Sequence, residues 1–318
     1  MKLVPVVHVV LASAGLLAAG LITAGCGTGP AGSLGPVPSA RSSPASPGLP
    51  PASSPPGAAQ SPGGPPATPP ASAPASPTPV PTRQISLQGW FTRNGKLFVT
   101  ERSVPATPAV AAAAIRSMLA GPSAAEYAAG LRSQIPAGTA LLGVRISGRV
   151  ATVDLSSSFV SSASQATMPL RIAQVVYTAT QFPTVTGVRF ALNGQGVTVL
   201  GGVPVQSPQT RAIERGYLPA IIVQNPAIGE QVASPVTVSG TADVFEATVS
   251  VRVLDAAGNE IARTFTTATC GTGCRGDYSV AISYTVPHTQ RGVIEVFESS
   301  AKDGRPINVQ LIPVTLTA

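Results

Sequence analysis

Residues 85–99 read ISLQGWFTRNGKLFV, and this stretch decides how the folded part of the chain begins. Two apolar-rich runs flank Asn94-Gly95, a dipeptide that favours the two-residue turn of a β-hairpin. Downstream, Thr107 is expected to cap a helix that has Pro108 at its first position, and Gly121-Pro122 ends it. The pattern therefore predicts a hairpin followed by a helix, whose buried stripe is Ala111, Ile115, Met118 and Leu119.

The next residues continue the alternation of strands and helices. Ser123 and Glu126 have the spacing of a capping box and predict a second short helix that ends near Gly130. Further strands are expected at 140–146, 149–155, 187–192 and 196–200, with a third helix at 168–182. This order predicts an α+β domain over residues 84–205, in which helices pack on one face of a mixed sheet.

The last hundred or so residues show short strands without helices. Candidate strands lie at 221–223, 236–240, 247–254, 260–266, 278–284, 293–297 and 309–316. Turn signals such as Asn225-Pro226 and Lys302-Asp303-Gly304 separate them. About seven alternating strands in this length predict an immunoglobulin-like β-sandwich over residues 217–318.

The start of the chain has the features of an export signal. Lys2 precedes an apolar stretch that reaches Ile22, and small residues lead to Cys26. The run resembles the lipobox of bacterial lipoproteins, which implies that residues 1–25 are removed and that Cys26 is acylated. The protein is then expected on the extracytoplasmic face of the cell membrane, held there through Cys26. An uncleaved membrane anchor is the alternative, because the stretch approaches the roughly 20 residues of a membrane span.

Residues 26–83 form a segment rich in Pro, Ala, Ser and Gly. More than half of the 33 prolines of the chain lie between Pro30 and Pro81. Such a composition cannot bury enough apolar surface to offset the loss of chain entropy on folding. We therefore expect a disordered linker between the membrane and the folded domains.

The chain has three cysteines, an odd number for an exported protein. If Cys26 is lipidated, Cys270 and Cys274 remain as a pair within the run CGTGC. Its two glycines allow the tight turn that a bridge between residues four apart requires, so a structural disulfide is predicted. A redox site would have two intervening residues, and a metal site would need more ligands. No metal or cofactor is expected.

The formal net charge of +7 does not point to nucleic-acid binding, because the cations are scattered and the chain has one tryptophan. A weak affinity for anionic envelope polymers stays open.

One group of residues could suggest a catalytic site: Asp154 with Ser156, Ser157 and Ser158. A nucleophilic serine needs a base, but no histidine lies near this group in the sequence. We expect these residues to be structural. The same is expected of the dispersed acids Glu246, Asp255, Asp277, Glu295, Glu298 and Asp303, so no catalytic residue is predicted.

Several motifs in order carry a resemblance to known families. Within 84–205 the runs are LAGP at 119–122, IPAGT at 135–139, VATVDLS at 150–156, AQVVYT at 173–178 and VRF at 188–190. They resemble the GerMN domain of sporulation and spore-germination proteins. Within 217–318 the runs are NPAIG at 225–229, SPVTVSGTA at 234–242, VFEA at 244–247, CGTGCRGDY at 270–278 and VFESSAKDG at 296–304. They resemble the immunoglobulin-like domain of bacterial spore-germination proteins.

The resemblance implies a non-catalytic binding or scaffolding lipoprotein in cell-envelope assembly, sporulation or germination. Its expected partners are other envelope proteins or a cell-wall polymer. Two alternatives remain open: a small-ligand carrier with a cleft between the domains, and a cell-wall hydrolase that uses dispersed carboxylates.

Overall fold

The chain divides into two units, Met1–Pro74 and Ala75–Ala318, and the computed structural model describes residues 83–318 of the second. The predictions for residues 1–25, for Cys26 and for the linker up to residue 82 lie outside the described residues. Within 83–318, none of the helices has the length and apolar content that a membrane span requires.

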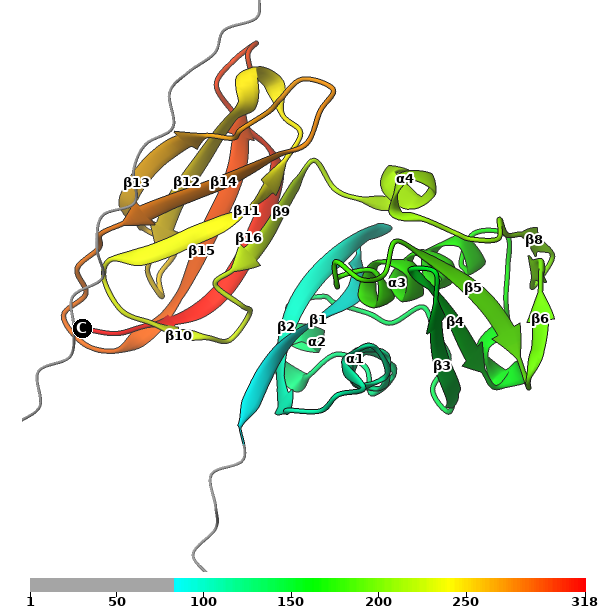
Figure 1. Ribbon diagram of the computed structural model, residues 1–318. Coiled ribbons are helices and arrows are strands. Elements are labelled where there is room, and N and C mark those ends of the chain that lie inside the picture. The colour runs from blue at the N-terminus through cyan, green and yellow to red at the C-terminus, as the bar shows by residue number, and fades with distance from the viewer. Residues whose placement is uncertain (1–82) are drawn as a thin grey trace, which may run out of the picture. The chain divides into compact units, whose positions relative to one another are not determined.

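The N-terminal region, residues 84–205, is the mixed α+β structure that the sequence predicts (Figure 1). Its four-stranded sheet has the order β3-β4-β5-β6, with β4 and β5 parallel and the other neighbours antiparallel. The elements in chain order are β1 (Gln84–Arg93), β2 (Lys96–Pro105), α1 (Val110–Leu119), α2 (Ala124–Ala128), β3 (Leu141–Ser147), β4 (Val150–Leu155), η1 (Ser157–Val160), α3 (Met168–Ala179), β5 (Gly187–Leu192), β6 (Gln195–Val197), β7 (Val199–Leu200) and β8 (Val203–Pro204).

Strands β1 and β2 form a hairpin of their own and do not join the four-stranded sheet. The predicted turn is present, with positive φ angles of 52° at Asn94 and 74° at Gly95. Helix α3 contacts this hairpin and also β5, so it packs between the hairpin and the sheet. Every residue of α3 except Pro169 and Leu170 is buried, so polar side chains such as Arg171 and Gln174 are enclosed together with the apolar ones.

Two predicted helix boundaries differ from the structure. Helix α1 begins at Val110, and its N-cap residue Ala109 makes no side-chain capping bond. The expected cap, Thr107, instead accepts a hydrogen bond from the backbone N–H of Ala109 at 3.2 Å, so the chain turns before the helix begins. The predicted third helix ends at Ala179 rather than at residue 182. The capping box of Ser123 and Glu126 at the start of α2 is confirmed.

The C-terminal region, residues 217–318, is the predicted β-sandwich. A five-stranded sheet has the order β10-β16-β15-β12-β13, and a three-stranded sheet has the order β14-β11-β9. The elements, with the two short helices that precede them, are α4 (Arg211–Glu214), η2 (Arg215–Tyr217), β9 (Ile221–Asn225), β10 (Gln231–Val232), β11 (Val236–Ala242), η3 (Phe245–Ala247), β12 (Thr248–Leu254), β13 (Glu260–Thr267), β14 (Gly276–Ile282), β15 (Gln290–Ser299) and β16 (Pro306–Leu316). Alternate side chains of these strands fill the space between the sheets.

The two regions share an apolar cluster at their junction. Trp90, Leu97 and Val99 of the hairpin pack with Tyr177 of α3 and with Ile222 of β9. The rings of Trp90 and Tyr177 lie with centroids 4.7 Å apart. Because β2 and β9 come into direct contact here, the tip of the hairpin lies beside the sandwich (Figure 1).

Candidate functional site

The disulfide between Cys270 and Cys274 is present in the loop that joins β13 to β14, with Cα atoms 5.7 Å apart. Its two glycines have different roles. Gly273 has a φ angle of +97°, which a side chain rarely tolerates. Gly271 lies so close to Ala247 that an added Cβ would be 2.4 Å from the backbone nitrogen. The bridge therefore closes a tight loop packed against η3, which indicates a structural role.

The grouping of Asp154 with its neighbouring serines makes local structural bonds. Asp154 accepts a hydrogen bond from the backbone N–H of Gly194 at 3.0 Å, and so holds the β5–β6 turn. The hydroxyl of Ser156 accepts a hydrogen bond from the backbone N–H of Ala140 at 3.0 Å. Ser157 and Ser158 lie in η1. These contacts give the side chains of Asp154 and Ser156 a structural role that requires no catalytic chemistry.

The dispersed acids of the C-terminal region lie in separate environments. Glu295 is buried and pairs with Arg252 at 2.8 Å. Glu298 is also buried and accepts hydrogen bonds from the backbone N–H of Phe245 at 2.9 Å and from the amide of Asn308 at 2.6 Å. Within residues 83–318, no three His, Cys, Asp or Glu residues gather in a way that could hold a metal ion.

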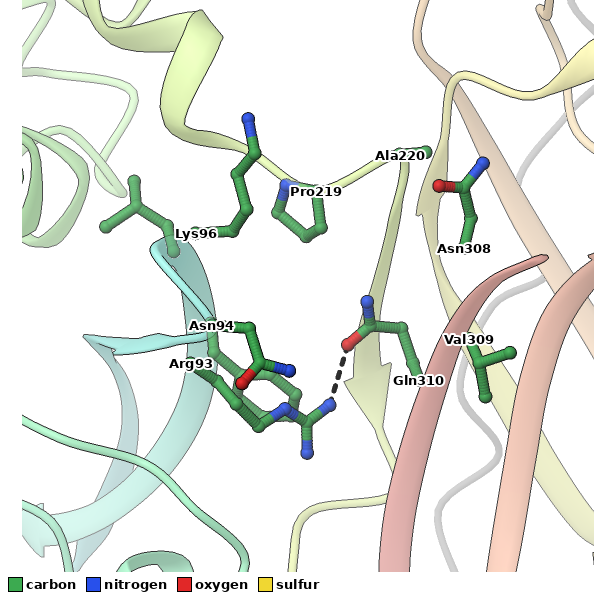
Figure 2. Close-up of a pocket in the computed structure, with 10 residues that line it drawn as sticks. Arg93, Asn94, Lys96, Pro219, Ala220, Asn308, Val309 and Gln310 are labelled. Atoms are coloured by element: carbon green, nitrogen blue, oxygen red, sulfur yellow. Dashed lines mark hydrogen bonds between the residues drawn. The ribbon is translucent and has the colours of Figure 1, made fainter.

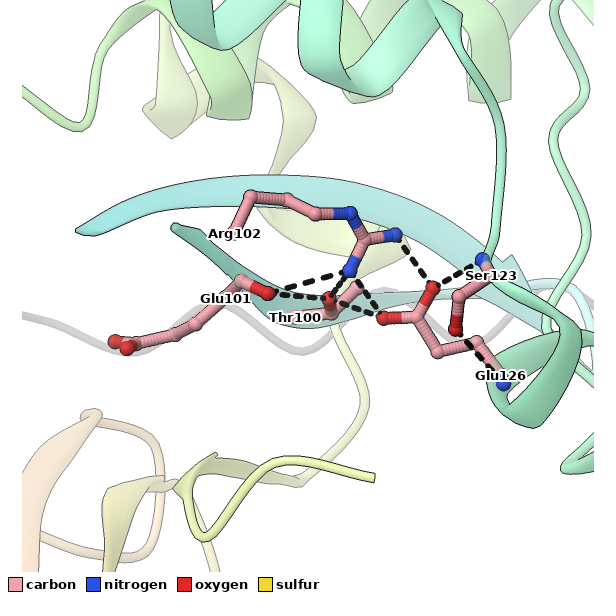
Figure 3. A network of polar contacts seen from close by, with 5 residues as sticks. All are labelled: Thr100, Glu101, Arg102, Ser123 and Glu126. Atoms are coloured by element: carbon pink, nitrogen blue, oxygen red, sulfur yellow. Dashed lines mark hydrogen bonds and ion pairs between the residues drawn. The ribbon is translucent and has the colours of Figure 1, made fainter. Parts of the chain in front are cut away.

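A polar network joins β2 to the start of α2 (Figure 3). The buried carboxylate of Glu126 accepts hydrogen bonds from Arg102 and Thr100, and from the backbone N–H of Ser123 at 2.7 Å. Burial alone would raise the pKa of Glu126, but these donors together hold it below its ordinary value. The carboxylate is thus kept ionised and bound on all sides, which indicates a structural ion pair.

A pocket of about 210 Å³ lies between the tip of the β1–β2 hairpin, the segment that leads into β9, and strand β16 (Figure 2). Three kinds of residue line it: two cations, three side-chain amides and a set of apolar groups. They are Arg93 and Lys96; Asn94, Asn308 and Gln310; and Leu97, Phe98, Pro219, Ala220 and Val309. Both folded regions therefore contribute to its wall, and such junctions are common places for ligand sites.

Arg93 and Lys96 connect the hairpin to the rest of the chain through neutral acceptors. The Arg93 guanidinium donates to the backbone carbonyl of Leu311 at 3.0 Å and to Oε1 of Gln310 at 2.7 Å. It also lies over the ring of Phe98, 4.3 Å from the centroid. The ammonium of Lys96 donates to the carbonyl of Gly216 at 2.8 Å. Burial lowers the pKa of Arg93, because part of its hydration is lost.

The two regions match two protein families. Residues 90–198 match the family described as "Sporulation and spore germination", and residues 220–305 match the "Immunoglobulin-like domain of bacterial spore germination". The chain carries one domain of each family. We therefore call the N-terminal region the GerMN domain and the C-terminal region the immunoglobulin-like domain. No curated protein matches the chain.

Two solved structures of GerMN domains are similar to part of this chain. The first GerMN domain of the sporulation protein GerM from Bacillus subtilis is 23% identical, with a TM-score of 0.36; the match covers 40% of this chain and 98% of that one. The tandem GerMN domains of the same protein are 14% identical, with a TM-score of 0.37, and the match covers 74% of this chain and 61% of that one.

Sequence reasoning did not single out the pocket residues. One signal was present, since Arg93 and Lys96 flank the Asn94-Gly95 turn and face each other across the GerMN hairpin. Gln310 belongs to the immunoglobulin-like domain and lies 217 positions from Arg93 in sequence. No local pattern connects two residues at that separation.

Proposed function

We propose that this protein is a lipid-anchored binding module on the extracytoplasmic face of the cell membrane, with a role in envelope assembly, sporulation or germination. The proposed anchor is Cys26, and the proposed partners are envelope proteins or a cell-wall polymer. The family matches support the sporulation or germination context. The observation that carries the binding role is the pocket at the junction of the two domains.

The anchor is tested by fractionating cells that express the Cys26→Ala variant. The acylated wild type is expected in the membrane fraction, and the variant is expected to be retained as a precursor or released. A matched variant, Cys270→Ala with Cys274→Ala, keeps Cys26 and should stay in the membrane fraction. Wild-type protein free of lipid on mass spectrometry would contradict the proposal.

The binding role is tested by photo-crosslinking in intact cells. A photoreactive residue at Val309, in the pocket wall, is compared with one at Ile213; these side chains are 38% and 39% exposed, and Ile213 does not line the pocket. The proposal expects one envelope component to be captured reproducibly from Val309 and not from Ile213. Equal capture from both positions, or none from Val309, would refute binding at the junction.

A small-ligand carrier is the second candidate, and the mixed lining of the pocket favours it. Cations, side-chain amides and apolar groups meet in one recess, as they do in many ligand sites. Native mass spectrometry of protein purified from its source should then show a bound small molecule. Protein that carries none, and acquires none from a cell extract, would count against a carrier.

A further inference from the structure

The tip of the β1–β2 hairpin places two like charges opposite each other. Arg93 and Lys96 are register partners across the two-residue turn. Like charges at directly opposed positions of an antiparallel pair destabilise it. The hairpin tip therefore has an electrostatic cost that a negatively charged group in the pocket would offset.

The surroundings of this pair leave its charge uncompensated. Neither Arg93 nor Lys96 forms an ion pair with any residue between 83 and 318. Their acceptors are two backbone carbonyls and one amide oxygen, all neutral. No carboxylate lines the pocket, and Glu298, which binds the amide of the lining residue Asn308, also accepts from Phe245. Part of the pocket wall is thus a positive surface within a partly desolvated recess.

Amide groups add donors beside the two cations. Because Oε1 of Gln310 accepts from Arg93, the amide nitrogen of Gln310 points the other way, away from the guanidinium (Figure 2). Asn94 and Asn308 place further side-chain amides around the opening. Lys96 uses one of its three N–H donors on Gly216, which leaves two for another acceptor.

We propose that this pocket binds a phosphate group, held by Arg93 and Lys96 and by the amide of Gln310. The inference rests on the proposed binding function and adds the chemistry of its ligand. A phosphate has three or four acceptor oxygens and a negative charge that matches the two cations of the pocket wall. The phosphate belongs either to a free phosphate ester or to an envelope polymer that contains phosphate.

The test is a calorimetric titration of the full chain, purified in detergent, with inorganic phosphate and with glycerol 3-phosphate. The wild type should bind both saturably, with an affinity that falls as salt is added. The double variant Arg93→Gln, Lys96→Gln should bind at least about tenfold more weakly, because two charge-assisted hydrogen bonds are lost. Lys96→Gln alone should also weaken binding, and it leaves the contacts of Arg93 with β16 in place.

The control is Arg116→Gln with Arg145→Gln, which removes the same charge from two exposed positions outside the pocket. It should bind phosphate as the wild type does. Binding by the pocket variants at wild-type strength, or no saturable binding of either probe to the wild type, would overturn the phosphate site. Stronger binding of acetate than of phosphate would overturn it as well.

A soluble glycerol-phosphate polymer separates the two sources of phosphate. If the polymer binds more tightly per phosphate group than glycerol 3-phosphate does, the result supports a polymer ligand. Equal affinity per phosphate group supports a free ester. The outcome is independent of the crosslinking result: phosphate binding without capture from Val309 refutes the proposed function alone, and capture without phosphate binding refutes this inference alone.

Discussion

At the scale of single residues, Glu126 and Glu214 show how surroundings decide the state of a buried carboxylate. Both are nearly inaccessible to solvent. Glu126 has Arg102, Thr100 and a backbone N–H as donors, and its pKa lies below the ordinary value. Burial raises the pKa of Glu214, whose side-chain donor is the amide of Gln209. The two residues therefore contribute to stability with opposite dependence on pH.

Replacement of Glu126 by Gln should lower the free energy of unfolding by about 3 kcal/mol, because Arg102 loses its charged partner in a largely buried site. The folded pKa is depressed, so the contribution is complete above the unfolded value of 4.5 and is lost as pH falls through the folded pKa. Urea unfolding between pH 3 and pH 7 measures both effects. Glu101→Gln, at an exposed position, is the control and should change stability by about 0.5 kcal/mol or less.

Glu214 should behave in the opposite way. Because burial raises its pKa, the folded state binds the proton more tightly than the unfolded state does. Stability therefore falls as the pH rises from the unfolded pKa of 4.5 toward the higher folded pKa. Glu214→Gln should remove that slope and should be most favourable, relative to wild type, at alkaline pH. Thermal unfolding at pH 4, 6 and 8 tests this. A variant with the same pH slope as wild type would show that folding does not raise the pKa of Glu214.

At the scale of elements, helix α3 takes the place of a neighbouring strand beside β1. The amide of Gln174 donates to the carbonyl of Trp90 at 2.9 Å, and Thr178 accepts from the N–H of Trp90 at 3.3 Å. Gln181 both donates to and accepts from the backbone of Gln88, each at 2.8 Å. Positions 174, 178 and 181 share one helix face, so a single face of the α3 segment satisfies the free edge of β1.

Gln174→Leu tests this arrangement, since the side chain also accepts from the backbone N–H of Gln134 at 2.9 Å. Leucine is similar in size but would leave one buried and one partly buried backbone group without partners, at a cost of about 3 kcal/mol. Denaturant unfolding measures the loss, and Gln195→Leu at an exposed position of β6 is the control. A loss below about 1 kcal/mol would mean that water replaces the amide.

At the scale of the whole folded unit, the apolar cluster around Ile222 couples the two domains. Ile222→Ala should remove about 3 kcal/mol from this junction, since it leaves a cavity among Trp90, Leu97 and Tyr177. We expect calorimetry to show two separate transitions in the variant where the wild type shows one. Ile222→Val removes one methylene and should keep a single transition, at a cost of about 1 kcal/mol. Two transitions in the wild type itself would show that the junction does not couple the domains.

Local features of the fold were predictable because the groups that interact lie close in sequence. The Asn94-Gly95 turn, the capping box of Ser123 and Glu126, and the bridge from Cys270 to Cys274 each span five residues or fewer. The start of α1 was predicted wrongly, because Thr107 satisfies the N–H of Ala109 in a turn and not in a helix. Propensity cannot separate these two uses of a threonine hydroxyl.

The sequence by itself determined the order of strands and helices, the two domain types and the disulfide, because periodicity, turn residues and spacing act over short distances. Only the tertiary structure decided that the β1–β2 hairpin is separate from the four-stranded sheet and packs on α3, and that its tip contacts β16. The pocket depends on contacts such as that between Arg93 and Gln310, which are 217 positions apart. Packing of the apolar cluster around Ile222 brings such residues together, and no local pattern encodes it.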